Sequence, residues 1–157
     1  MNLNAIRNRL IVLDGSVLIG LALGEKQFNE LKEAIIQGLV HPITHELAII
    51  EMLYILCRRK SMELARRKYE FLKSSGFIEI IPTAELIEDV GMVKCKRRLA
   101  IADCFTIALA IKLDAVAVFA KLEKELKLEL TKEPFQCDFF FILEDKFVHK
   151  RTLIRSP

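Results

Sequence analysis

The sequence lacks several features that would assign it to a common class of protein. Its four cysteines, Cys57, Cys95, Cys104 and Cys137, include no CxxC pair, which argues against a zinc site or a redox motif. No run reaches the roughly 18 uninterrupted apolar residues that a membrane helix requires. No GxGxxG or GxxxxGK loop follows an expected strand, so a nucleotide-binding Rossmann protein is disfavoured. The three histidines form no evident cluster, and none is marked as a catalytic base.

The chain also lacks repeats, low-complexity segments and a separate helix-turn-helix domain. Its 157 residues fit one domain and suffice to bury most of the surface of the unfolded chain. We therefore expect a single domain over residues 1–157. Apolar residues make up 52% of the chain against 29% charged residues, a balance that favours a subunit or partner interface, and we expect a homodimer.

Two features bear on the compartment. Two of the scattered cysteines lie in apolar helical stretches, as buried reduced thiols do, which indicates a reducing cytoplasm. Arg7 and Arg9 precede an apolar stretch that ends in LALG, as they would in a signal peptide. Asp14 in the middle of that stretch argues against this alternative, so we expect a cytoplasmic protein without membrane association.

Basic residues are clustered, although the net charge is only +3. So mild a charge does not by itself indicate nucleic-acid binding, and any one cluster is more simply explained as a solvated helix face. The clusters lie at residues 58–60, 66–68 and 94–98, and in the tail at Lys150, Arg151 and Arg155.

Short β-rich runs alternate with helical segments along the chain. We expect strands at residues 9–13, 39–44, 77–81, 115–120 and 137–142. This alternation predicts a parallel sheet with helices on both faces, in which ligands bind beyond the carboxyl ends of the strands. The segment 45–60 is apolar nearly all round, which predicts a buried helix, and Thr44 is its expected N-cap.

Asp14 follows the first expected strand, inside the apolar stretch RLIVLDGSVLIG at residues 9–20. A carboxylate taken out of water without a partner is strongly destabilising, so this position needs compensation. Capping of the following helix, with help from Ser16, would supply it. The sequence leaves this explanation open beside a functional one.

Three further acids share this oddity. Asp103 opens an apolar helix and would serve as its N-cap, and Glu123, just after the fourth strand, fits an exposed helix start. Glu51 is harder to explain structurally, because it is a lone carboxylate in an apolar helix. Arg58 and Arg59 lie about two turns further on, beyond the spacing of three or four residues that favours ion pairs.

A divalent metal ion would satisfy these acids together. Hard cations such as Mg²⁺ take oxygen ligands and are held by a few carboxylates with water and substrate phosphate. The joint explanation is therefore favoured over separate structural ones.

Four motifs carry a resemblance to a known family: LDGS after the first strand, AIIEMLYILCRR on one helix, IADCFTIALAIKL on a later helix, and AVFAKLEKEL after the next strand. In order, spacing and residue type the chain resembles the PIN domain family, including the VapC-type toxin ribonucleases of prokaryotes, over a core of about residues 9–142. The resemblance implies a three-layer α/β/α, Rossmann-like fold with a parallel sheet of about five strands in the order 3-2-1-4-5. It also implies an Mg²⁺- or Mn²⁺-dependent ribonuclease. The short basic tail after Leu143 has no assignment.

The resemblance further implies roles for single residues. Asp14, Glu51 and Asp103 match the metal-binding acids of the family, with Asp14 and Asp103 on the main ion and Glu51 on it directly or through water. Ser16 matches a small hydroxyl position that would orient Asp14 or a water on the ion. The ion itself lowers the pKa of a water molecule, so no histidine or lysine base is needed.

The fourth acid departs from the pattern. Family members commonly carry an Asp just after the fourth strand, where this chain has Lys121. Glu123 is the nearest substitute for a second metal site, and Glu125 is the next. Basic residues that flank the acids in sequence are candidates to hold RNA phosphates: Lys121, Lys94, Arg97 and Arg98.

The function implied is a metal-dependent endoribonuclease that hydrolyses single-stranded RNA, as the toxin of a toxin–antitoxin pair inhibited by a small antitoxin protein. One alternative is a housekeeping RNA-processing nuclease of the same fold. Another is a catalytically weak PIN-like module that binds RNA or protein, and the displaced fourth acid is the best argument for it.

Overall fold

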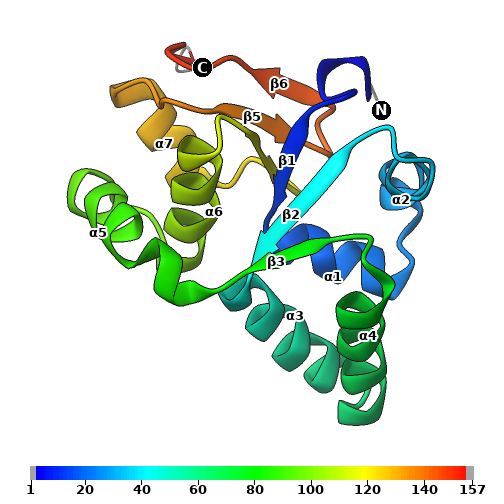
Figure 1. The fold of residues 1–157 in the computed structure, drawn as a ribbon. Coiled ribbons are helices and arrows are strands. Elements are labelled where there is room, and N and C mark those ends of the chain that lie inside the picture. The colour runs from blue at the N-terminus through cyan, green and yellow to red at the C-terminus, as the bar shows by residue number, and fades with distance from the viewer. Residues whose placement is uncertain (1–2, 155–157) are drawn as a thin grey trace.

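The computed structural model describes residues 3–154 as a six-stranded sheet between two layers of helices (Figure 1). The strands are β1 (Leu10–Leu13), β2 (His41–His45), β3 (Glu79–Ile81), β4 (Val116–Phe119), β5 (Asp138–Phe141) and β6 (Lys146–Val148). Their order is β3-β2-β1-β4-β5-β6. The first five are parallel, which confirms the three-layer α/β/α fold and the order 3-2-1-4-5.

The sixth strand lies in the tail that the sequence left unassigned. β6 pairs antiparallel with β5, so the sheet is mixed at this edge. Asp138 holds the residues after β6 in place, because its Oδ1 accepts a 2.6 Å hydrogen bond from the Lys150 backbone N–H. Its Oδ2 forms an ion pair with Arg9, which precedes β1. Arg155, counted with the basic tail, lies outside the described residues.

Helices join the strands. They are α1 (Gly15–Leu23), α2 (Asn29–Ile36), α3 (Glu46–Arg59), α4 (Met62–Ser75), α5 (Ile87–Lys96), α6 (Ile101–Lys112) and α7 (Lys124–Lys132), with 3₁₀ turns at Leu3–Ala5, Lys26–Phe28 and Thr83–Leu86. In Figure 1, α5, α6 and α7 lie on one side of the sheet, and α1, α2 and α4 on the other.

Alternation along the strands separates two hydrophobic cores. Ile11 and Leu13 of β1 pack with buried residues of α1 to α4, whereas Val12 points to the opposite face and packs with α5, α6 and α7. Both faces of the sheet are therefore covered, and the carboxyl ends of the strands are the edge left for polar chemistry.

The helix caps agree with the sequence-based expectation at Asp14 but not at α3. Asp14 caps α1 and Ser61 caps α4. The expectation for α3 is wrong, because the N-cap is His45, whose Nδ1 accepts the Ala48 backbone N–H at 3.2 Å. Thr44 instead belongs to β2, and its hydroxyl donates to the Leu13 carbonyl across the sheet at 2.8 Å.

The expectation that α3 is buried all round is also wrong. Ala48, Ile49, Met52 and Leu56 face the core, but Ile50 is 54% exposed. Although α3 packs against α1 and α4, its residues Ile50 and Tyr54 remain exposed.

None of the helices within residues 3–154 is long and apolar enough to span a membrane.

Candidate active site

Asp14 lies at the carboxyl end of β1, and 6% of its surface is exposed. Its Oδ2 accepts two hydrogen bonds from Ser16, one from the backbone N–H at 2.9 Å and one from the hydroxyl at 2.6 Å. Its Oδ1 accepts one from the Thr106 hydroxyl at 3.2 Å. Burial raises the pKa of Asp14, although these hydrogen bonds act in the opposite direction. The buried carboxylate is thus satisfied by local donors as well as being the cap of α1.

Ser16 joins two strands at the site. Besides donating to Asp14, its Oγ accepts the backbone N–H of Ala120 at 3.1 Å. Since Ala120 follows β4, this hydroxyl fixes the first turn of α1 to the end of the neighbouring strand. The residue that the sequence selected as an orienting hydroxyl is therefore in direct contact with Asp14.

Glu51 projects from the second turn of α3 and packs on the backbone of Gly15. A Cβ atom at Gly15 would lie 2.3 Å from Glu51 Oε2 and 3.1 Å from Glu51 Cβ, so a side chain at this position would displace the Glu51 carboxylate. Burial, with the charges of Asp14 and Asp103, raises the pKa of Glu51 to about 7. The structure thus brings Glu51 to the side of Asp14.

Asp103 lies in the first turn of α6, and its charge contributes to the raised pKa of Glu51. It is not the N-cap, because that position is Ala100, so the capping explanation for Asp103 is wrong. Burial raises its pKa to about 7, with further contributions from the charges of Asp14, Glu123 and Glu125 and an opposing one from Lys94.

The two candidates for the fourth acid both belong to the start of α7. Glu123 is the N-cap residue without a side-chain capping bond, and its carboxylate pairs with Lys121 at 3.3 Å. The charges of Glu123 and Glu125 both raise the pKa of Asp103, so both carboxylates lie close enough to act on it. Lys121, in the position of the usual Asp, neutralises part of the charge of Glu123.

The acids fit a hydrated divalent cation better than direct enclosure of an ion. Among residues 3–154, no three His, Cys, Asp or Glu side chains are close enough to hold a metal ion by themselves. Burial nevertheless raises the pKa values of Asp14, Glu51 and Asp103, and nearby carboxylates raise those of Glu51 and Asp103 further. Mg²⁺ keeps several waters and needs only one or two direct carboxylate ligands.

The basic residues divide into two groups. Lys94 lies beside the acids, because its charge opposes the rise in the pKa of Asp103, and its ammonium donates to the Leu99 carbonyl. Arg98 is exposed in the connection between α5 and α6, and Lys121 is exposed after β4. These three are positioned at the rim of the acidic site or exposed in the loops next to it.

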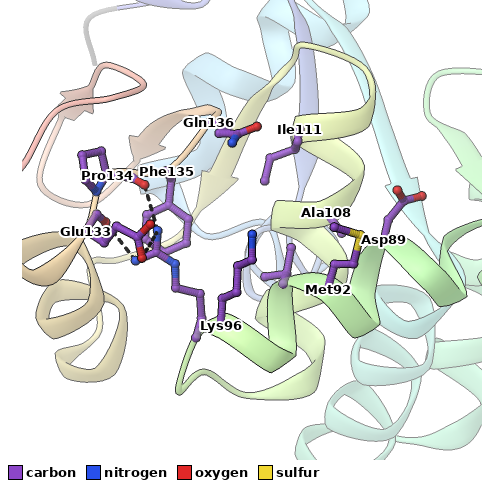
Figure 2. Close-up of a pocket in the computed structure, with 11 residues that line it drawn as sticks. Asp89, Met92, Lys96, Ala108, Ile111, Glu133, Pro134, Phe135 and Gln136 are labelled. Atoms are coloured by element: carbon purple, nitrogen blue, oxygen red, sulfur yellow. Dashed lines mark hydrogen bonds and ion pairs between the residues drawn. The ribbon is translucent and has the colours of Figure 1, made fainter.

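Arg97 is not exposed beside the acidic site. The expectation that it contacts RNA phosphates is therefore wrong. Its side chain is buried, and its guanidinium donates to the Glu133 carbonyl at 2.9 Å and the Pro134 carbonyl at 2.8 Å. It also lies 4.0 Å from the centroid of the Phe135 ring. Figure 2 shows the pocket beside it, between α5, α6 and the segment before β5. Arg97 therefore fastens this segment to α5.

Sequence reasoning missed two residues of the site. Thr106 donates to Asp14, and His45 Nε2 lies 3.0 Å from the Thr106 hydroxyl. Burial lowers the pKa of His45 to about 4, so the ring is neutral. The available signal was that Thr106 is the one hydroxyl residue in the apolar run from Cys104 to Ala110.

Comparison with known proteins identifies the family of the chain. The PIN domain family model matches residues 11–121, so the chain belongs to the PIN domain family. No curated protein sequence matches the chain. The crystal structure of VapC20 from Mycobacterium tuberculosis, described as a toxin that cleaves the sarcin–ricin loop, is similar with a TM-score of 0.58 and 16% identity. The match covers 75% of this chain and 93% of that one. The structure of PAE2754 from Pyrobaculum aerophilum has a TM-score of 0.49 and 19% identity over 80% of this chain and 85% of that one.

Proposed function

We propose that the protein is a divalent-metal-dependent endoribonuclease that hydrolyses phosphodiester bonds of single-stranded RNA and acts as the toxin of a toxin–antitoxin pair. One observation carries the proposal. Asp14, Glu51 and Asp103 come from three separate elements, and the charge of Asp14 adds to burial in raising the pKa values of both Glu51 and Asp103. Structural carboxylates would be paired with cations, whereas a cluster of this kind is typical of a metal site.

The ion in the proposal is Mg²⁺ or Mn²⁺, held by Asp14 and Asp103, with Glu51 on it directly or through water. When bound, such an ion lowers the pKa of a water molecule and neutralises charge on the scissile phosphate. Ser16 occupies both lone-pair directions of Asp14 Oδ2 with hydrogen bonds, which leaves Oδ1 as the oxygen with capacity for a further ligand. Glu123, with Glu125 as the alternative, adds negative charge near Asp103 for a second ion.

Substrate binding is proposed for the basic residues at the rim. Lys94 and Lys121 are next to the acids, and Arg98 is exposed one connection away. Their ammonium and guanidinium groups would hold the RNA phosphates on either side of the scissile bond. The similarity in fold to VapC20, described as a toxin that cleaves the sarcin–ricin loop, supports RNA as the substrate class.

An antitoxin and a second subunit are proposed from the apolar surface. A groove of about 410 Å³ lies between α1, α2 and α4, and exposed Ile36, Phe71 and Phe77 contribute to its lining. Apolar anchors of an inhibitor segment need such a surface. Ile50 and Tyr54 on the outer face of α3 are exposed separately and suit a homodimer contact. A cytoplasmic location follows from the proposed pairing with an antitoxin and from the RNA substrate.

The test is cleavage of a fluorescent pool of short single-stranded RNAs by the purified protein in Mg²⁺, Mn²⁺ or EDTA, beside the Asp103→Asn variant. We expect metal-dependent cleavage that the substitution abolishes without unfolding the protein. Cleavage by the variant at the wild-type rate would contradict the assignment. Co-purification of a short partner protein that inhibits the cleavage distinguishes a toxin from a housekeeping nuclease, and an active enzyme isolated without such a partner would favour the housekeeping alternative.

A further inference from the structure

His45 is a fully buried polar residue that the proposed chemistry does not use. It ends β2 and caps α3, and its ring lies against Phe105 with 5.4 Å between the ring centroids. A histidine in a core is often no more than a space-filling side chain with one satisfied nitrogen. Here both ring nitrogens have partners, and one of those partners contacts Asp14.

The direction of each hydrogen bond follows from the first one. The backbone N–H of Ala48 is always a donor, and it points at His45 Nδ1 at 3.2 Å. Nδ1 therefore carries a lone pair, and the single proton of the neutral ring is on Nε2. Nε2–H then donates to the Thr106 hydroxyl oxygen at 3.0 Å. Thr106 has one proton of its own, so it must donate it to a different acceptor.

Two acceptors compete for that proton. The carboxylate Oδ1 of Asp14 lies at 3.2 Å and the Ala102 carbonyl at 3.5 Å from the Thr106 oxygen. The carboxylate is closer and carries charge, which makes it the stronger acceptor. A donor at His45 also polarises the hydroxyl, which strengthens the bond to Asp14.

We infer that His45 and Thr106 form a relay that positions Asp14: His45 directs the Thr106 proton onto Oδ1, so that this carboxylate keeps one orientation while its remaining lone pair stays available to a cation. The inference rests on the proposed function, since it assigns the purpose of the relay to metal binding. His45 and Thr106 are positioning residues, and neither touches the substrate.

Two substitutions at His45 separate the relay from simple capping. In His45→Asn the amide oxygen reaches as far as Nδ1 and keeps the Ala48 cap, but the side chain is too short to reach Thr106. In His45→Gln the amide nitrogen reaches as far as Nε2 and restores the donor to Thr106, but the cap is lost. The relay predicts that Mn²⁺ affinity falls about tenfold in His45→Asn and stays at the wild-type value in His45→Gln. If His45 is only a cap, His45→Asn retains full affinity and the inference is overturned.

Thr106 provides a second, independent pair. Thr106→Val removes the hydroxyl with little change in shape, and Thr106→Ser keeps it. Mn²⁺ affinity, measured by calorimetry on protein shown to be folded by circular dichroism, should fall about tenfold in the first variant and recover in the second. Equal affinity in both variants would contradict the relay.

The ring tautomer gives a readout that is separate from metal binding and from activity. Proton–nitrogen correlation spectra of the metal-free wild type should place the His45 proton on Nε2, and a proton on Nδ1 would overturn the inference. If the wild type binds no Mn²⁺, the proposed function fails and the purpose assigned to the relay fails with it. If the wild type binds Mn²⁺ and His45→Asn binds equally well, only the relay fails.

Discussion

Glu51 packs against Gly15 so closely that a methyl group on Gly15 would lie 2.3 Å from the Glu51 carboxylate. Gly15 follows Asp14 directly, so the helix α3 brings a second acid onto the backbone of the first. This contact explains why a glycine follows the aspartate in LDGS. It also allows the position of Glu51 to be tested without changing any charge.

Gly15→Ala should displace the Glu51 carboxylate and weaken Mn²⁺ binding about tenfold, because misplaced ligands lose affinity even when their chemistry is intact. Gly91→Ala is the matched control, since no heavy atom lies within 4 Å of a Cβ built at this α5 position. It should leave Mn²⁺ affinity unchanged and stabilise the fold by about 1 kcal/mol. Calorimetric titration measures both, and unchanged affinity in Gly15→Ala would show that Glu51 does not bind the ion.

The raised pKa values predict an unusual pH dependence of stability in the metal-free protein. Glu51 and Asp103 titrate at about 7 in the folded state, against 4.5 and 3.8 ordinarily. Between the unfolded and the folded pKa values, the folded protein binds protons that the unfolded chain has released. The contribution of these two groups to the stability of the fold therefore falls as the pH rises toward 7. Buried His45 has the opposite trend, with its pKa lowered to about 4.

A double variant, Glu51→Gln with Asp103→Asn, separates the effect of the acids on stability from the effect of His45. It lacks the two titrating carboxyls and retains His45. Urea unfolding at about pH 5 and about pH 8 should show the wild type losing stability relative to the variant at the higher pH. Saturating Mg²⁺ should remove the loss, since the ion replaces the protons. A constant difference between the two proteins at both pH values would mean that folding does not raise the pKa values of these carboxyls.

Arg97 and Arg98 are neighbours in sequence with different expected roles. Arg97→Met should destabilise the fold by about 2–4 kcal/mol, because it leaves the Glu133 and Pro134 carbonyls without their donors. Arg98→Met should leave stability unchanged and reduce the salt dependence of RNA binding, as expected for the loss of one phosphate contact. Urea unfolding and RNA binding at two salt concentrations, measured on both variants, check this. A salt dependence reduced by Arg97→Met and not by Arg98→Met would reverse the assignment.

The sequence was sufficient for the features that are local or periodic. Alternating β-rich and helical runs predicted a parallel sheet, and the family resemblance implied the order 3-2-1-4-5 and a role for Ser16 beside Asp14. The strand β6 was not foreseen because it has only three residues, and it depends on pairing with β5.

Tertiary contacts account for the other differences. Lys94, Arg97 and Arg98 all belong to one basic cluster in the sequence, yet Arg97 alone turns inward to two carbonyls that are 36 and 37 residues away. The pair formed by Thr106 and His45 joins residues 61 positions apart and shows no spacing in the sequence. The contact between Thr106 and His45 depends on the packing of α6 against β1 and β2. The local sequence pattern does not specify this packing.

The most direct test of the account is the binding of Mn²⁺ to the wild type and to the Asp14→Asn variant, measured by calorimetry at about pH 8, where the acids are ionised. Asparagine keeps the cap of α1, so the variant should remain folded within about 1 kcal/mol of the wild type. We predict that the wild type binds the ion and that the variant binds it at least about tenfold more weakly. Equal binding by both proteins, or no binding by the folded wild type, would contradict the claim that Asp14 is buried at the end of β1 in order to hold a metal ion.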